Sequence, residues 1–140
     1  MTTLASAALR QKPGFEEFVN FSPAERFLQR LPITRLGKTL YLQAARVVWI
    51  GTQYRMVFAH TDLQRHALDF GLDALCEKLD PAKFFRVHRS TIVNLDQIAN
   101  VEYLDDGRCV LNMKDKTNSA ITVSRYRVGE FKNVFNGRPA

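Results

Sequence analysis

The chain has 140 residues, of which 46% are hydrophobic and 24% are charged, as in an ordinary single globular domain. No window approaches the roughly 18 apolar residues that span a bilayer, and no basic start precedes the mildly apolar first residues, so we expect neither a membrane anchor nor a secretory signal. The formal net charge of +6 favours a polyanionic partner, and we expect a cytoplasmic protein.

The N-terminal region contains one helix signal. Residues 1–21 show no sustained periodicity, whereas SPAERFLQRL at residues 22–31 begins with a serine, a proline and a glutamate at the spacing of a capping box. Its apolar residues share one face, and Pro32 would end the helix. We therefore expect residues 1–30 to form an extension with a short helix, which serves as a linker or in dimerisation.

From Ile33 onward, short segments rich in β-branched and aromatic residues predict strands. ITRLGKTLYL has a turn signal at Gly37-Lys38, and residues 51–53 would form the loop between RVVWIG and QYRMVFAH. FGLDALCEKLDP has apolar residues at helical spacing and predicts a helix over residues 72–79. Five further strand candidates follow it, and RYRVGEFKNVF predicts a closing helix that its glycine weakens. Short strands at near-regular spacing indicate a mainly β fold.

The cysteines and histidines do not suggest a metal or redox site. Cys76 and Cys109 lie far apart without C-x-x-C spacing, so we expect reduced, buried thiols. His60, His66 and His88 lack the spacing of a metal-ligand pair. We expect no metal and no other cofactor.

The stretch FFRVHRSTIVNL, residues 84–95, interrupts strand-like sequence with His88, Arg89 and Ser90. A serine beside a histidine could act as nucleophile and base, but no acid is placed to orient the imidazole. The chain also lacks the G-x-S-x-G, Walker A and G-x-G-x-x-G patterns. We therefore expect that the protein is not an enzyme.

Arginines at two corners favour nucleic acid instead. Arg89 and Ser90 could present a donor fork to a guanine edge or a phosphate. The stretch VSRYR repeats the pattern, with Arg125 and Arg127 placed where a strand ends. The ordinary role of any single arginine is a solvated surface ion pair, but two such corners in one basic β domain favour a polyanionic partner.

The run FFRVHRSTIVNLDQIANVE, followed by VSRYR, closely resembles the LytTR-type DNA-binding domain of bacterial transcription regulators. On this resemblance we expect such a domain over residues 31–137, with a tail at residues 138–140. It implies short, mostly antiparallel strands in small sheets with one or two short flanking helices. It also implies sequence-specific binding of double-stranded DNA and transcription regulation, through loops in successive major grooves, usually at direct repeats and with bending of the duplex.

The resemblance implies three contact loops. They correspond here to residues 51–55, with Gln53, Tyr54 and Arg55 as unranked candidates, to Arg89 with its neighbour Ser90, and to Arg125 with Arg127 close by. Where family members commonly have Glu-Ala after Trp-Ile, this chain has Gly51-Thr52, and this departure could alter base preference at the first loop.

Two further residues of the resembling stretch are expected to be structural. His88 would form a largely buried, hydrogen-bonded corner, and Asn94 would tie a turn by bonding its side chain to the main chain.

Family members often carry a receiver domain before the DNA-binding part, whereas about 30 residues precede it here, fewer than the roughly 100 of an ordinary domain. If the chain is the whole protein, control would come from its abundance, from homodimerisation or from a regulatory protein partner. We therefore keep one alternative, a protein-interaction module that sequesters or modulates another transcription regulator. RNA binding is disfavoured, because the chain has no aromatic RNP-like pattern.

Overall fold

A computed structural model describes residues 26–138 of the chain. Its strands are β1 (Arg30–Arg35), β2 (Lys38–Gln43), β3 (Trp49–Gln53), β4 (Met56–His60), β5 (Arg65–Leu68), β6 (Phe84–His88), β7 (Thr91–Asn94), β8 (Ile98–Tyr103), β9 (Cys109–Met113) and β10 (Ala120–Val123). Its helical elements are the helices α2 (Leu72–Lys78) and α3 (Val128–Asn136) and the 3-10 turns η1 (Ala44–Arg46), η2 (Leu95–Gln97) and η3 (Arg125–Arg127).

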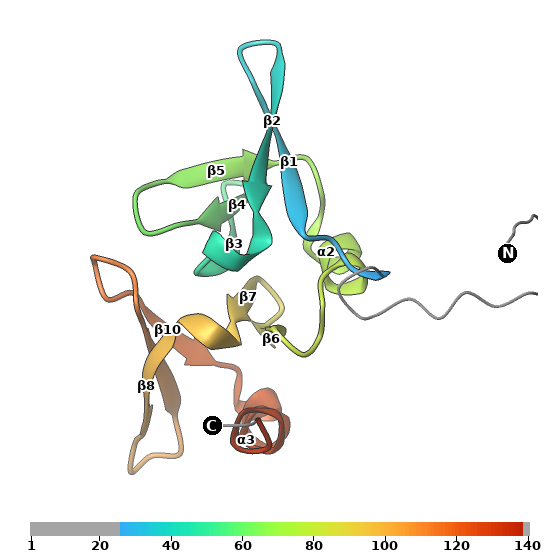
Figure 1. Ribbon diagram of the computed structural model, residues 1–140. Coiled ribbons are helices and arrows are strands. Elements are labelled where there is room, and N and C mark those ends of the chain that lie inside the picture. The colour runs from blue at the N-terminus through green and yellow to red at the C-terminus, as the bar shows by residue number, and fades with distance from the viewer. Residues whose placement is uncertain (1–25, 139–140) are drawn as a thin grey trace, which may run out of the picture.

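The strands form three sheets, and every pairing is antiparallel. β1 and β2 form a hairpin, the central sheet has the order β5-β4-β3-β7-β6, and a third sheet has the order β10-β9-β8. Figure 1 shows the β1–β2 hairpin projecting at the top and the third sheet at the bottom. Within residues 26–138, neither helix has the length and apolar content needed to cross a membrane.

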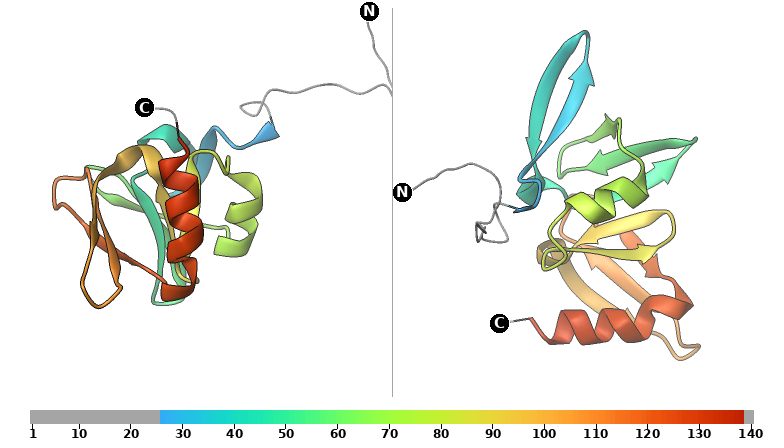
Figure 2. Two further views of the ribbon diagram at one scale, coloured as in Figure 1. Left: turned by 90° about the horizontal axis from the view of Figure 1, so that it is seen from below. Right: turned by 90° about the vertical axis from the view of Figure 1, so that its right-hand side faces the viewer.

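The central sheet is buried on both faces, because neighbouring residues alternate between two hydrophobic cores. Ile50 and Ile92, paired across β3 and β7, belong to the core that α2 and the β1–β2 hairpin complete. Val93 and Phe85, paired across β7 and β6, belong to the other core, together with residues of the third sheet and Phe131 of α3. Figure 2 shows α2 beside the hairpin half of the molecule and α3 beside the third sheet.

The helix predicted over residues 72–79 forms as α2, and its leucines Leu72 and Leu75 are buried, as is Leu79 directly after it. Cys76, which was expected to be buried, is exposed, whereas Cys109 in β9 is buried. Leu72, Leu75 and Leu79 make the contact between this short helix and the core, and Cys76, the fourth residue of the predicted face, stays exposed to solvent.

The helix predicted over residues 22–31 is wrong over residues 27–31, and its capping residues lie outside the described part of the chain. The backbone is not helical over residues 27–31, and Leu31 lies in β1, paired with β2 and fully buried. Pro32 disfavours a helical backbone in the residue before it. Leu31 and Ile33 both face the core, which is the two-residue spacing of a strand.

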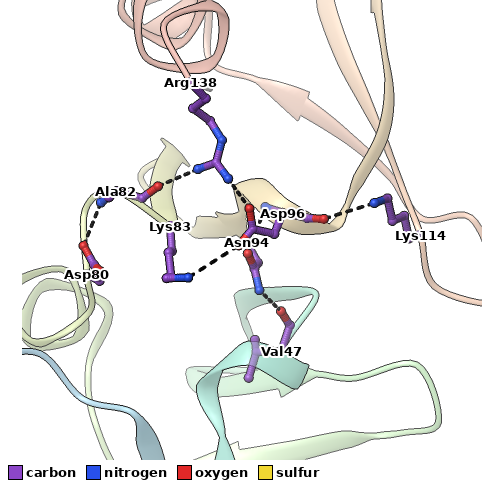
Figure 3. A network of polar contacts seen from close by, with 8 residues as sticks. All are labelled: Val47, Asp80, Ala82, Lys83, Asn94, Asp96, Lys114 and Arg138. Carbon is purple, nitrogen blue, oxygen red and sulfur yellow. Dashed lines mark hydrogen bonds and ion pairs between the residues drawn. The ribbon is translucent and has the colours of Figure 1, made fainter. Parts of the chain in front are cut away.

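A network of polar contacts fixes the end of the central sheet where β7 passes into η2 (Figure 3). The buried Asn94 side chain donates to the carbonyl oxygen of Val47 at 2.8 Å and accepts from the backbone N–H of Asp96 at 3.0 Å. The Asp96 carboxylate pairs with Arg138, which also donates to the carbonyl oxygen of Ala82 at 2.5 Å. Through these bonds, Arg138 holds the end of the described chain against the junctions before β6 and after β7.

Trp49, the only tryptophan in the chain, lies along β3 toward position 51. Its ring stacks on His60, its partner on β4, with centroids 3.7 Å apart and 4° between the ring planes. A Cβ atom added at Gly51 would lie 2.4 Å from a carbon of the same ring. The glycine therefore gives the indole the space it occupies. This is a physical reason for a glycine at the position where the domains that the sequence resembles commonly have a glutamate.

We expect replacement of Gly51 by alanine to destabilise the fold by about 1–3 kcal/mol, because the new methyl group must displace the stacked ring. Thermal unfolding measures the loss, and the fluorescence of the only tryptophan reports the displacement. Gly129→Ala in α3 is the matched control, because nothing lies within 4 Å of a Cβ atom there. It should leave stability unchanged or raise it. Equal unfolding temperatures for wild type and Gly51→Ala would contradict the role given to Gly51.

The stacked histidine also predicts a pH dependence of stability. Burial, and secondly the charge of Arg65, lower the pKa of His60 from 6.5 to about 4. Between these values the unfolded chain binds the proton and the folded chain does not, so stability falls as the pH is lowered through this range. Unfolding temperatures of wild type and His60→Phe between about pH 7 and pH 4 test this, because the variant keeps an aromatic ring without the titrating group. Parallel curves for the two proteins would contradict the prediction.

Candidate nucleic-acid interface

Backbone pairing brings the first two predicted loops to the same end of the central sheet. β3 pairs with β7, with Gly51 opposite Thr91. The N–H of Thr52 donates to the carbonyl oxygen of Ser90 at 3.0 Å. The β3–β4 turn and the β6–β7 turn therefore leave the sheet next to each other.

The third predicted loop joins this end through β10. The N–H of Ser124 donates to the carbonyl oxygen of Val87 at 2.7 Å, which places the start of η3 beside the end of β6. Arg55, Arg89 and Arg125 are exposed and come from three separate turns. With Arg108, which is described below, they form a surface that we call the arginine edge.

The turn between β3 and β4 lies directly after residues 51–53, which were expected to form the loop. Residues 51–53 belong to β3, and the turn is made by Tyr54 and Arg55, whose φ angles are +53° and +65°. Two such residues suit a two-residue hairpin, because this backbone matches the twist of the flanking strands. The amide oxygen of Gln53 accepts from Arg65 at 2.8 Å, whereas the Tyr54 side chain is 81% exposed at the tip. Tyr54 and Arg55 are thus the candidates that project furthest from the sheet.

The second turn is held by His88. Its Nδ1 atom accepts from the backbone N–H of Ser90 at 3.1 Å and lies 2.8 Å from the Ser90 Oγ atom. The ring is half-buried, while Arg89 between these two residues is exposed. Among the contacts described for His88, none joins its ring to a carboxylate, so the pair lacks the third member of a nucleophilic triad.

Arg127, expected near the third contact, turns back toward the protein. Its Nε atom donates to the carbonyl oxygen of Arg86 at 3.0 Å, and its Nη1 atom bonds Glu130 at 2.5 Å. Its guanidinium lies over the ring of Phe85, 4.6 Å from the centroid. Arg125, two residues earlier, has no such internal contact among those described, and its side chain remains at the surface.

The structure adds two residues that the sequence did not single out. An open hollow of about 590 Å³ lies between the end of β6, the β8–β9 turn and η3, and His88, Arg108, Arg125 and Tyr126 are among the residues that line it. Tyr126 is 96% exposed. The only sequence signal for Arg108 is its place directly after the Asp-Asp-Gly turn, which by itself does not show that this turn meets the other two.

The acidic group closest to Arg108 in sequence is itself paired. The backbone N–H of Arg108 bonds the carboxylate of Asp106 at 3.0 Å, and its Nε atom bonds the same group at 2.7 Å. These bonds lower the pKa of Asp106. Within residues 26–138, His, Cys, Asp and Glu side chains form no group of three or more that could hold a metal ion. The edge therefore offers guanidinium donors, an exposed phenol and backbone turns, which are groups suited to contacting a polyanion.

Residues 37–136 match a family model described as the LytTr DNA-binding domain. The transcriptional regulatory protein YpdB of Escherichia coli (strain K12) is 29% identical over 108 residues, which cover 77% of this chain and 41% of YpdB. The heme-containing CO-sensing transcriptional regulator RcoM 2 of Paraburkholderia xenovorans is 28% identical over 112 residues, which cover 80% of this chain and 42% of that protein. The chain thus spans about two fifths of the length of these relatives.

A solved LytTr DNA-binding domain from Bacillus cereus has the same fold. It superposes with a TM-score of 0.70 at 16% sequence identity, and the match covers 79% of this chain and 99% of the other. This likeness confirms the predicted mainly β class, with short antiparallel strands in small sheets and two short helices. Because the family model spans far more than half of its residues, the chain belongs to the LytTr DNA-binding domain family.

Proposed function

We propose that this chain binds double-stranded DNA sequence-specifically and regulates transcription, with the arginine edge as its contact surface. The observation that carries the proposal is the meeting of separate turns at one edge, with Arg55, Arg89, Arg108 and Arg125 all exposed on it. Membership of a DNA-binding family and the net charge of +6 support it. Transcription regulation is also what the names of the relatives state.

The chemistry of the contact follows from the guanidinium group. An arginine can donate two parallel hydrogen bonds to the O6 and N7 atoms of guanine or to a phosphate. Arg89 and Arg125 leave the protein at neighbouring turns, so both side chains can address one face of a duplex. We propose that these two read base edges, and that Arg55 and Arg108 neutralise phosphates beside them.

The remaining predicted residues divide between contact and support. Tyr54 lies at the tip of the first turn and is free to meet the sugar-phosphate backbone. Ser90 and His88 bond each other and keep the Arg89 turn in place. Asn94 fixes the far end of β7 through the main chain.

We further propose that the domain, residues 31–137 extended by Arg138, enters successive major grooves at direct repeats and bends the duplex. We propose that residues 1–30 serve as a linker or in dimerisation between two copies bound at neighbouring repeats. A protein whose binding site is built from several turns gains contacts when the duplex curves toward it, and these contacts offset the cost of bending.

Replacement of Arg89 or Arg125 by alanine should lower affinity for the specific duplex about 5- to 150-fold, because a bidentate base contact is worth about 1–3 kcal/mol. The unfolding temperature should stay near that of wild type, because both side chains are exposed. Arg46→Ala is the matched control: it removes the same charge from an exposed arginine of η1, which is not part of the arginine edge. Fluorescence anisotropy across a salt series distinguishes the two kinds of contact. Loss of a base contact lowers the ratio of specific to non-specific affinity, whereas loss of a phosphate contact reduces the dependence of affinity on salt. If both variants bind like wild type, the assignment of these arginines is wrong.

A second candidate function is an interaction module for another regulator, and the β1–β2 hairpin favours it. Leu36 is 97% exposed, Tyr41 60% and Leu40 48%, on a hairpin that projects from the rest of the described chain (Figure 1). Exposed apolar side chains gathered on one element are typical of contact surfaces.

Selection from random duplex DNA separates the two functions. The proposed function predicts an enriched motif, repeated at a spacing of about one helical turn or a multiple of it. Recovery of no motif, together with a stable protein complex in size-exclusion chromatography, would favour the interaction module instead.

A further inference from the structure

Arg86 lies on β6 next to the arginine edge, and its side chain is only partly exposed. Its side chain is 28% exposed, and its Nε atom is buried with no hydrogen-bond partner among the described residues. The pairing of β6 with β7 shifts register between Arg86 and His88. The residue therefore sits at the irregular step where β6 leads into the Arg89 turn.

The guanidinium of Arg86 bonds the main chain of that turn. Its Nη2 atom donates to the carbonyl oxygen of Arg89 at 2.5 Å, and its Nη1 atom bonds the carboxylate of Asp73 in α2 at the same distance. The bond to Asp73 is the first cause of a raised pKa for Arg86, against the effect of burial. One guanidinium thus joins a helix on one side of the sheet to the backbone that carries Arg89.

Arg86 also bonds η3, the segment that carries Arg125. The carbonyl oxygen of Arg86 accepts from the Nε atom of Arg127 at 3.0 Å, and Arg127 follows Arg125 in η3. Arg86 is therefore bonded through its side chain to the Arg89 turn and through its main chain to the Arg125 segment.

The Arg89 turn needs such support more than the other two-residue turns do. Leu36-Gly37 and Tyr54-Arg55 have positive φ angles, which suit the twist of a hairpin, whereas Arg89 and Ser90 are not among the residues with positive φ. A turn with ordinary φ angles between two paired strands splays them. One main-chain bond, from the N–H of Thr52 to the carbonyl oxygen of Ser90, anchors the base of this turn. The side-chain contacts described for it are the bond from Arg86, the contacts between His88 and Ser90, and the contact between the hydroxyls of Ser90 and Thr91.

We propose that Arg86 is a positioning residue for DNA recognition: held by Asp73, it fixes the direction in which Arg89 leaves the protein and couples it to the Arg125 segment, without touching DNA itself. This inference rests on the proposed function of the arginine edge. It assigns specificity to a residue that is mostly buried and to a helix that does not face the duplex.

A double-mutant cycle tests the proposal with the full chain and the duplex recovered by selection. Arg86→Gln should lower specific affinity about tenfold and leave affinity for random duplex within about twofold, because its main effect is on an arginine that reads a base. The one charge that it removes is also removed in the control Arg138→Gln described next. In an Arg89→Ala background the same substitution should cost less than about twofold. A full tenfold loss in both backgrounds would show that Arg86 acts independently of Arg89, and no loss in either would show that it does not act at all; each result would overturn the proposal.

The matched control is Arg138→Gln. Arg138 also joins a carboxylate, that of Asp96, to a backbone carbonyl, that of Ala82, but at the other end of the central sheet (Figure 3). It should change the unfolding temperature without changing the ratio of specific to non-specific affinity. A loss of that ratio in Arg138→Gln would reduce the effect of Arg86→Gln to general destabilisation.

Asp73→Asn tests the same link through an exposed residue and covers the case in which Arg86→Gln fails to fold. Removal of a negative charge near DNA would by itself tighten binding, whereas loosening of Arg86 weakens it. We expect specific affinity to fall about two- to threefold, because an exposed ion pair contributes little. Tighter specific binding would overturn the role of Asp73.

A measurement without DNA separates this inference from the proposed function. Backbone ¹⁵N relaxation of the free protein should show Arg89 and Ser90 more mobile in Arg86→Gln than in wild type or Arg138→Gln. If the wild-type chain enriches no duplex, the proposed function fails while this result still shows whether Arg86 holds the turn. Unchanged relaxation in Arg86→Gln would overturn the positioning role whatever the DNA experiments show.

Discussion

The antiparallel pairing of β3 with β7 is the interaction on which the rest of this structure depends. It joins the β3–β4 and β6–β7 hairpins, whose chains are about 40 residues apart in sequence, into one five-stranded sheet. The sheet then has two faces to bury. One face packs against α2 and the β1–β2 hairpin, and the other packs against α3 and the third sheet. The same pairing sets the two hairpin turns side by side, and without it the exposed arginines would belong to separate surfaces.

The central sheet has one end held by polar side chains and one end that presents them. At the η2 end, the buried Asn94 and the exposed Asp96 bond other parts of the protein, with the main chain and with Arg138 as partners. At the opposite end, main-chain bonds from Thr52 and Ser124 act together with side-chain bonds from Arg86 and His88, and they leave Arg89 and Arg125 exposed. This division keeps the turns in place while their guanidinium groups remain available.

Much of the fold could be predicted from local sequence, because strand-forming runs, turn signals and the leucine spacing of α2 are local. The family resemblance placed Arg89 and Arg125, which the structure brings together. The first turn was misplaced because Gly51 serves as space for Trp49, whereas a glycine in sequence suggests a turn. The N-terminal helix was wrong at Leu31 because pairing with β2 overrides a local capping pattern. Arg108 and the bonds of Arg86 depend on contacts between distant segments, which no local pattern contains.

Because the central sheet is shared by two cores, its strands should differ in how often local unfolding exposes them. Opening either core uncovers one face of the central sheet and leaves the other face packed, so β3 and β7, at the middle of the sheet, are exposed only when both sides give way. Their amide hydrogens should therefore be among the last to exchange with solvent. The N–H of Thr52, bonded to the carbonyl oxygen of Ser90, extends this slow exchange to the base of the turn that carries Arg89. A surface loop in this protein is thus anchored in its most persistent hydrogen bonds.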